Sequence, residues 1–86
     1  MSAYMQVYPN PVQSTATLVF SAEKANTRYQ VVVTDVNGKA VLTSTGITNS
    51  GRNVLQLNMN QYANGMYLVK LIGDGETRTI KLYKEK

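Results

Sequence analysis

The side chains that could carry chemistry are few and of limited types. The chain has 86 residues and contains neither histidine nor cysteine. Ser-His-Asp and Cys-His catalytic arrangements and His–Cys zinc sites are therefore excluded. The serines lie in no recognisable motif. The carboxylates that remain are Glu23, Asp35, Asp74, Glu76 and Glu85. A glycosidase needs two carboxylates across a cleft, which so small a domain rarely encloses, so we expect no catalytic residue and no cofactor.

Calcium is the metal that these residues would suit best. Asp35 and Asn37 at one expected turn, or Asp74 and Glu76 at another, supply oxygen ligands of the kind that calcium prefers. Neither pair has the spacing of an EF-hand loop, and acids and asparagines at hairpin ends usually cap turns. The GDGE stretch is a lone GxG without a following helix to receive a phosphate. We therefore expect two capped turns and no metal site.

Six tyrosines offer an alternative, a stacking platform for sugars or bases. They are Tyr4, Tyr8, Tyr29, Tyr62, Tyr67 and Tyr83. Tyr29 and Tyr67 fall on core-facing positions and the chain has no tryptophan, which favours packing within the core. The net charge of +4 is modest and no readout motif is present, so we expect no nucleic-acid partner.

Most of the net charge lies near the C-terminus. From residue 77 onward, the chain carries four basic side chains and one acidic side chain: Arg78, Lys81, Lys84 and Lys86 against Glu85. Such an end can attract an acidic protein surface or an anionic lipid, or it can simply protect an edge strand. No apolar run reaches the ~20 residues of a membrane-spanning helix. The first residues lack the basic start and apolar centre of a signal peptide, as those of a domain cut from a longer secreted chain also would.

The elements that must position these residues have a period of two. Alternating apolar residues predict strands over residues 5–8, 14–21, 29–36, 40–45, 53–58, 66–72 and 77–83. Seven strands at about ten-residue spacing are typical of an all-β, immunoglobulin-like antiparallel sandwich. We expect residues 5–86 to form this single domain and residues 1–4 to be a linker or vector remnant.

Three local features refine this expectation. Asn37-Gly38 predicts a type I′ hairpin turn, and Gly73-Asp74-Gly75 predicts a second tight turn. In the last strand, we expect Ile80 and Leu82 to face the core, with Arg78, Thr79 and Lys81 opposite them. In VYPNP, residues 7–11, the prolines cannot donate to a sheet ladder and hold the residues before them extended. This segment should stiffen the exit from the first strand.

The order of several short motifs supports a family resemblance. They are YPNP at residues 8–11, VVVTDVNGKAV at 31–41, LQLN at 55–58, NGMYLVKL at 64–71 and TRTIKLYK at 77–84. Together they cover nearly the whole chain. In this order and spacing, the chain resembles the type A C-terminal sorting domain of cargo proteins of the type IX (Por) secretion system of Bacteroidota.

The resemblance implies a non-catalytic address for protein export. Domains of this family end larger secreted enzymes and adhesins, so a cargo domain would precede this one. The implied partners are the outer-membrane type IX translocon, its shuttle proteins and a sortase-like cysteine peptidase. That peptidase would remove the domain, before or near residues 1–4 here, and the cargo would be anchored at the cell surface or released. The implied route runs through the periplasm to the surface or medium.

The resemblance also assigns motif positions in this chain. Those expected to be structural are Pro9, Asn10, Pro11, Asp35 and Gly38. Those expected to take part in translocon recognition are Gly65, Tyr67, Lys81 and Lys84. Lys81 and Lys84 are the expected contacts, because a folded core does not need basic residues there.

Two alternative interpretations, in which the chain has another kind of function, stay open at this point. The chain could be an accessory sandwich of an extracellular hydrolase, binding carbohydrate or serving as a spacer, which predicts an exposed aromatic strip. It could also be an assembly module that associates with itself by strand addition at an exposed edge.

Overall fold

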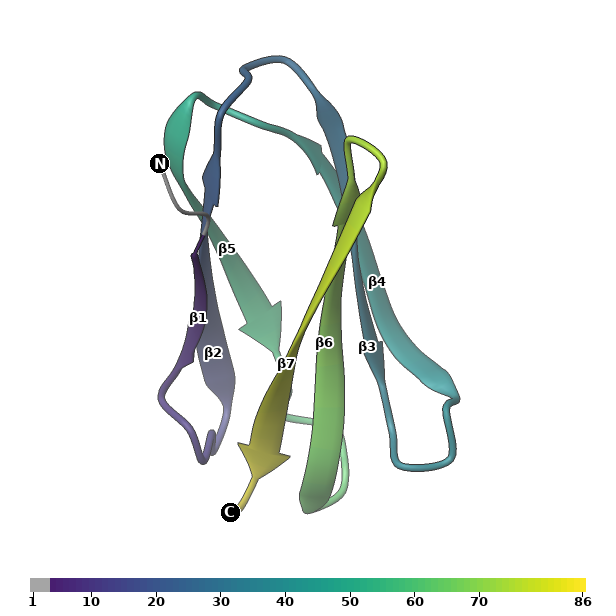
Figure 1. Cartoon of the computed structure of the whole chain (residues 1–86). Helices are drawn as coiled ribbons and strands as arrows, with labels where there is room; N and C mark the ends of the chain where they lie inside the picture. The colour runs from purple at the N-terminus through teal and green to yellow at the C-terminus, as the bar shows by residue number, and fades with distance from the viewer. Residues whose placement is uncertain (1–3) are drawn as a thin grey trace.

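The fold is built entirely from the strands that the alternating pattern predicts. The computed structural model describes residues 4–86 and contains seven strands in the described part of the chain (Figure 1). They are β1 (Met5–Tyr8), β2 (Thr15–Ala22), β3 (Arg28–Thr34), β4 (Ala40–Ile47), β5 (Gly51–Asn58), β6 (Gly65–Gly73) and β7 (Glu76–Lys84). Residues 1–3, expected to be part of a linker, lie outside the described residues. No helix long and apolar enough to cross a membrane occurs in residues 4–86.

The strands form two facing sheets. One has the order β1-β2-β5 and the other β4-β3-β6-β7, and every neighbouring pair is antiparallel. The edge strands β1 and β7 come from opposite ends of the chain and lie next to each other across the two sheets (Figure 1). This arrangement confirms the immunoglobulin-like sandwich expected from the sequence.

The core lies between the sheets and is made by alternate residues of each strand. Leu18 and Phe20 of β2 face Val31 and Val33 of β3, and all four are at most 1% exposed. Burial of each such side chain contributes roughly 1.5–3 kcal/mol. With no disulfide available, this apolar layer is the main source of stability.

The turn between β6 and β7 is the tight hairpin that the sequence predicts. Asp74 and Gly75 both have positive φ, 51° and 74°, and the residues on either side of them, Gly73 and Glu76, pair across the hairpin. These are the features of a two-residue type I′ turn.

The turn between β3 and β4 differs from the predicted type I′ turn, so that prediction is wrong. Only Gly38 has positive φ there, 83°. Its N–H donates to the Asp35 carbonyl at 3.0 Å, and the β3–β4 register shifts next to the turn. The Asp35 carboxylate accepts from the N–H groups of Asn37 and Lys39 at 2.9 and 3.0 Å. It thereby holds a longer loop, in which glycine alone takes the left-handed conformation.

The direction of Arg78 also differs from the expectation. Arg78 shares the alternation of Ile80 and Leu82, because all three pair with inward-facing residues of β6. Its side chain therefore lies on the core side of β7. The prediction that Arg78 lies on the face opposite Ile80 and Leu82 is wrong. Thr79 and Lys81 do lie on the opposite face, as predicted. A strict period of two requires this result.

Candidate functional site: the C-terminal corner

Three motif stretches that are distant in sequence meet at the C-terminal end of β7. We call this region the C-terminal corner and define it as residues 9–12, 64–65 and 81–86. It lies where the last strand ends, at the lower end of the sandwich (Figure 1). Hydrogen bonds described below join all three stretches.

Asn10 binds the outer edge of β7 with both ends of its side-chain amide. Its Nδ2 donates to the Lys81 carbonyl at 3.0 Å, and its Oδ1 accepts from the Tyr83 N–H at 2.9 Å. An edge strand exposes just such unpaired backbone groups. The asparagine of the proline motif therefore replaces part of a neighbouring strand, across a sequence separation of 71 residues.

Val12 continues the same edge with its backbone. Its N–H donates to the Tyr83 carbonyl at 2.7 Å, and its carbonyl accepts from the Glu85 N–H at 3.0 Å, forming a parallel bridge with Lys84. The Val12 side chain is fully buried. The segment after β1 thus leaves the first sheet and pairs with the second, which gives the proline motif a more specific role than stiffening.

Pro9 and Pro11 fit this crossing because neither offers an N–H that would need a partner. Both peptide bonds that precede them are cis. The donors that reach β7 come instead from the side chain of Asn10 and the backbone of Val12.

The glycine–tyrosine motif fixes the other side of the corner. Asn64 Oδ1 accepts from the Lys86 N–H at 3.2 Å, and Gly65 pairs with Lys84. Gly65 has a φ of 149°, and a β-carbon there would meet no atom within 4 Å. Glycine is therefore required by backbone conformation and not by crowding.

Tyr67 anchors the loop that leads into β6. Its side chain is only 6% exposed, as the core-facing pattern predicts. Its hydroxyl donates to the Ala63 carbonyl at 2.6 Å, in the manner of the tyrosine corner of immunoglobulin-like folds. Nearby, the Tyr62 hydroxyl donates to the Val41 carbonyl at 2.8 Å. The sequence indicated the burial of Tyr67 but not this hydrogen bond.

The two lysines expected at the recognition surface have opposite environments. Lys81 is exposed on the outer face of β7, whereas Lys84 is only 3% exposed on the inner side. The burial of Lys84 leaves little of its side chain on the surface where a partner would make contact. Its long apolar stem packs inside, as lysine stems can. In the folded domain, Lys81 and Gly65 are accessible, while Tyr67 and Lys84 are not.

Asp35 and Gly38 do not belong to the corner. They form the β3–β4 turn, at the same end of the sandwich but on the far side of β6 and β3 (Figure 1). Their contacts are those that shape the turn.

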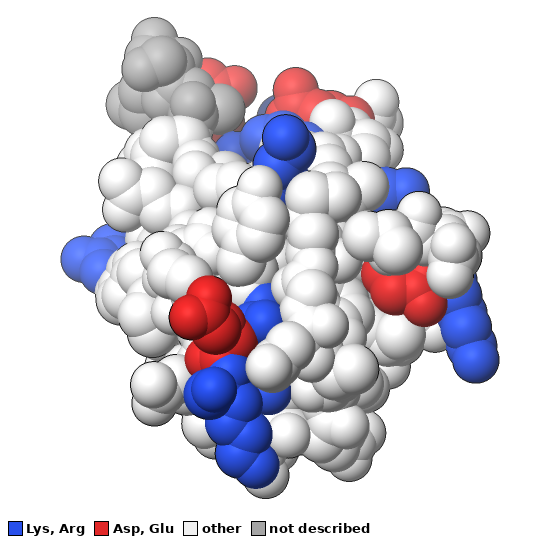
Figure 2. Space-filling model, turned by 90° about the horizontal axis from the view of Figure 1, so that it is seen from below, with Lys and Arg blue, Asp and Glu red and all other residues white. Residues whose placement is uncertain are grey.

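The surface at this end is not a continuous basic patch. Figure 2 looks onto it from below and shows separate blue and red groups within a mainly uncharged surface. In this view, the basic side chains of the described residues do not merge into one patch. The corner offers a shape made by backbone, prolines and amides, with individual charges around it.

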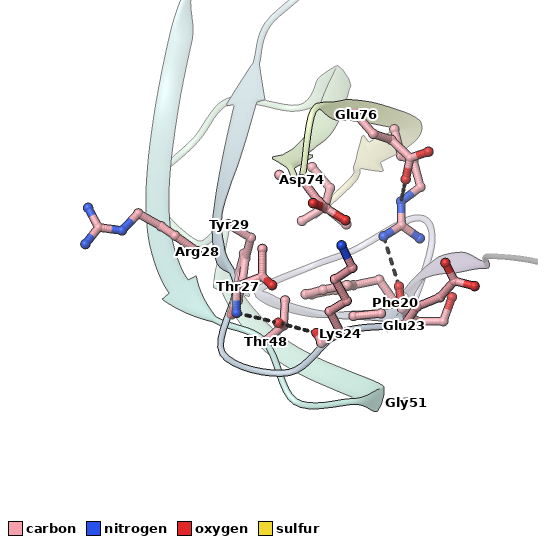
Figure 3. Close-up of a pocket in the computed structure, with 15 residues that line it drawn as sticks. Phe20, Glu23, Lys24, Thr27, Arg28, Tyr29, Thr48, Gly51, Asp74 and Glu76 are labelled. Carbon is pink, nitrogen blue, oxygen red and sulfur yellow. Dashed lines mark hydrogen bonds and ion pairs between the residues drawn. The ribbon is translucent and has the colours of Figure 1, made fainter.

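At the opposite end of the sandwich is a cleft of about 190 Å³ (Figure 3). Phe20 and Tyr29 line it, with ring centroids 5.0 Å apart in an edge-to-face arrangement. Arg78 closes one side: it donates to the Ser21 carbonyl at 2.9 Å and lies 3.7 Å from Glu76. These aromatic rings pack against the core and do not form an exposed strip.

The two residue pairs considered for calcium do not form a cluster of ligands. No group of three or more acidic ligands occurs within residues 4–86. Asp35 caps its turn, and Glu76 pairs with Arg78.

Comparison with known families identifies the family of this chain. A family model described as a secretion system C-terminal sorting domain matches residues 6–85, which include every stretch of the C-terminal corner except Lys86. No curated protein matches the chain. The match spans almost the full length and confirms the resemblance drawn from the sequence. The chain belongs to the family of secretion system C-terminal sorting domains.

Proposed function

We propose that this domain is an export address that the secretion machinery reads in its folded form at the C-terminal corner. The observation that supports this is that hydrogen bonds join three motif stretches into the corner. One of these hydrogen bonds connects residues that are 71 positions apart in the sequence. A linear signal would not need Asn10 to reach β7. A folded signal does, because the fold alone brings these groups together.

In this proposal, the domain binds and does not catalyse. The outer-membrane type IX translocon and its shuttle proteins contact the accessible groups of the corner, above all Lys81 and Gly65. Tyr67 acts from inside by holding the loop that leads into β6, and the buried Lys84 makes no direct contact with the partner. A sortase-like cysteine peptidase then separates the domain from its cargo, which is anchored at the surface or released.

The test of the folded address is a secretion assay in a bacterium with a type IX system. Residues 4–86 are fused to the C-terminus of a fluorescent protein that carries a signal peptide. We expect the fusion to reach the surface or the medium. We expect the double variant Val31→Asp/Val33→Asp to stay in the periplasm, because it places charges at fully buried positions. Export of that unfolded variant at the unmodified level would show that a linear peptide is read.

A second comparison tests the corner itself. Lys81→Ala removes an exposed charge at the corner, and Lys39→Ala removes an exposed charge at the β3–β4 turn. We expect export to fall several-fold for Lys81→Ala and to be unchanged for Lys39→Ala. Equal export of both variants would place recognition elsewhere on the folded domain.

A further inference from the structure

The outer face of the four-stranded sheet has an unusual composition for a surface that meets only solvent. The register places the outward residues of β6 in its centre: Met66, Leu68, Lys70 and Ile72. The first three are half-buried and Ile72 is 38% exposed. Val32 of β3 pairs with Lys70, so it lies on the same face. This face is apolar in its middle.

Cations accompany these apolar residues. Lys70 lies in the central row, between Val32 and Thr79, and Lys81 lies beside Leu68. Arg28, which opens β3, points away from the cleft at that end (Figure 3). The face is therefore positively charged as well as apolar.

No carboxylate offsets these charges within the face. All five acidic residues lie within residues 4–86, and each is in a loop or at the end of a strand. Glu23 lies before β3, Asp35 and Asp74 are in turns, Glu76 begins β7, and Glu85 follows it. Between the strand ends, the only charged side chains of the outer rows are those of Lys70 and Lys81; Arg28 lies at the first position of β3.

The outer face of the other sheet provides the contrast. Its outward residues are mainly amides and hydroxyls, for example Gln6, Thr17 and Gln56, which share neighbouring rows. It has one cation, Arg52, and one well-exposed aliphatic residue in the middle of a strand, Val54, at 52%. The two sheets differ in size, with three strands against four, and their outer faces differ in composition as well.

We propose that the outer face of the β4-β3-β6-β7 sheet is a docking surface for a protein of the secretion machinery, and that the partner presents apolar residues surrounded by carboxylates. The inference rests on the proposed function and adds a second surface, which adjoins the C-terminal corner at Lys81. Charge complementarity supports an acidic partner. A second copy of the chain would bring like charges together, which disfavours self-association through this face.

The size of the face fits a transient contact. Four strands about 4.8 Å apart and about eight residues long present roughly 500 Å². Stable complexes bury about 800 Å² on each partner. A smaller contact suits an address that has to be released after export.

Charge and apolar variants in matched pairs test this surface in the secretion assay. Lys70→Glu and Ile72→Ser alter the proposed face, and Arg52→Glu and Val54→Ser make the same kinds of change on the other outer face. We expect export to fall at least tenfold for each of the two variants on the proposed face, Lys70→Glu and Ile72→Ser. For each of the two variants on the other face, we expect it to fall less than twofold. Thermal unfolding of each purified domain checks that it is folded. If Lys70→Glu does not fold, Lys70→Gln replaces it, with an expected loss of several-fold.

Photo-crosslinking identifies the occupant. A photoreactive amino acid at position 72 should crosslink to a protein segment that contains carboxylates on both sides of apolar residues, and one at position 54 should not. A crosslinked dimer of the fusion, or a product with lipopolysaccharide, would overturn the proposal. So would equal export by folded variants of both pairs, which would leave the export address itself intact. If the unmodified fusion is not exported, the proposed function fails and this inference fails with it.

Discussion

The two ends of β7 each place a basic residue on the inner side of the sandwich, but they accommodate it differently. Arg78 is held by polar partners: its guanidinium donates to the carbonyls of Tyr4 and Ser21 at 3.1 and 2.9 Å. It also lies 5.9 Å from the Phe20 ring centroid. Lys84 is more deeply buried, at 3% exposed, and no hydrogen bond or ion pair of its amine is seen among residues 4–86.

The difference shows two ways to protect an edge strand. An inward-facing charge discourages another chain from pairing with the edge. At the Arg78 end, that charge also links β7 to β2 and to Tyr4, the residue before β1. At the Lys84 end, the link is made instead by Asn10 and Val12, which pair directly with the backbone of β7. The proline motif therefore does at one end what an arginine side chain does at the other.

The largest effect should come from the apolar packing beside Lys84. Leu82→Ala removes a fully buried side chain and should lower the free energy of unfolding by about 2–5 kcal/mol. Urea denaturation followed by tyrosine fluorescence measures it. Thr79→Ala, on the outer face of the same strand, is the control and should change stability by less than about 0.5 kcal/mol. A Leu82→Ala domain as stable as this control would show that the Lys84 end is not held by packing.

Loss of the asparagine bridge should have the next largest effect. Asn10→Ala removes two hydrogen bonds to the β7 edge, which at about 1 kcal/mol each should cost about 2 kcal/mol. Asn64→Ala removes a single exposed bond to Lys86 and should cost less than about 0.5 kcal/mol. Amide hydrogen exchange should quicken at Tyr83 in Asn10→Ala alone. Unchanged exchange at Tyr83 would mean that Val12 alone holds this edge.

At the other end of the strand, Arg78→Met should destabilise the domain by about 1–2 kcal/mol. The variant keeps much of the stem but leaves the carbonyls of Tyr4 and Ser21 without this donor. We expect a smaller loss of stability than for two fully buried hydrogen bonds, because the Arg78 side chain is 24% exposed and water can replace part of the interaction. Glu76→Gln, which alters only the exposed ion pair, is the control. Equal stability of both variants and the unmodified domain would remove the proposed link between β7 and β1.

The smallest change in stability, and one of opposite sign, is expected for Lys84→Met. Replacing a buried cation by an apolar side chain of similar length should leave stability unchanged or raise it by up to about 1 kcal/mol. Thermal unfolding of Lys84→Met and Arg78→Met in parallel makes the comparison directly. A loss above about 1 kcal/mol for Lys84→Met would show that the amine has a stabilising partner.

Sequence reasoning predicted the elements well but only part of the corner. Alternation predicted all seven strands, and the same alternation, followed strictly, would have placed Arg78 inside with Ile80. The prediction of a type I′ turn at Asn37-Gly38 was wrong because it considered these two residues alone. The Asp35 carboxylate accepts hydrogen bonds from two backbone N–H groups of the turn and stabilises a longer loop. The bridge of Asn10 could not be predicted, because no local pattern indicates which backbone groups a side chain will meet.

The fold class and the family could be predicted without the structure, because strand period, turn residues and motif order are properties of the linear sequence. The tertiary structure alone decided that residues 9–12 cross to the second sheet and pair with β7, and that Lys84 is buried while Lys81 is exposed. The reason is physical. Local propensities act over a few residues, whereas the partners of an edge strand and the burial of its side chains depend on which distant segments the two sheets bring together.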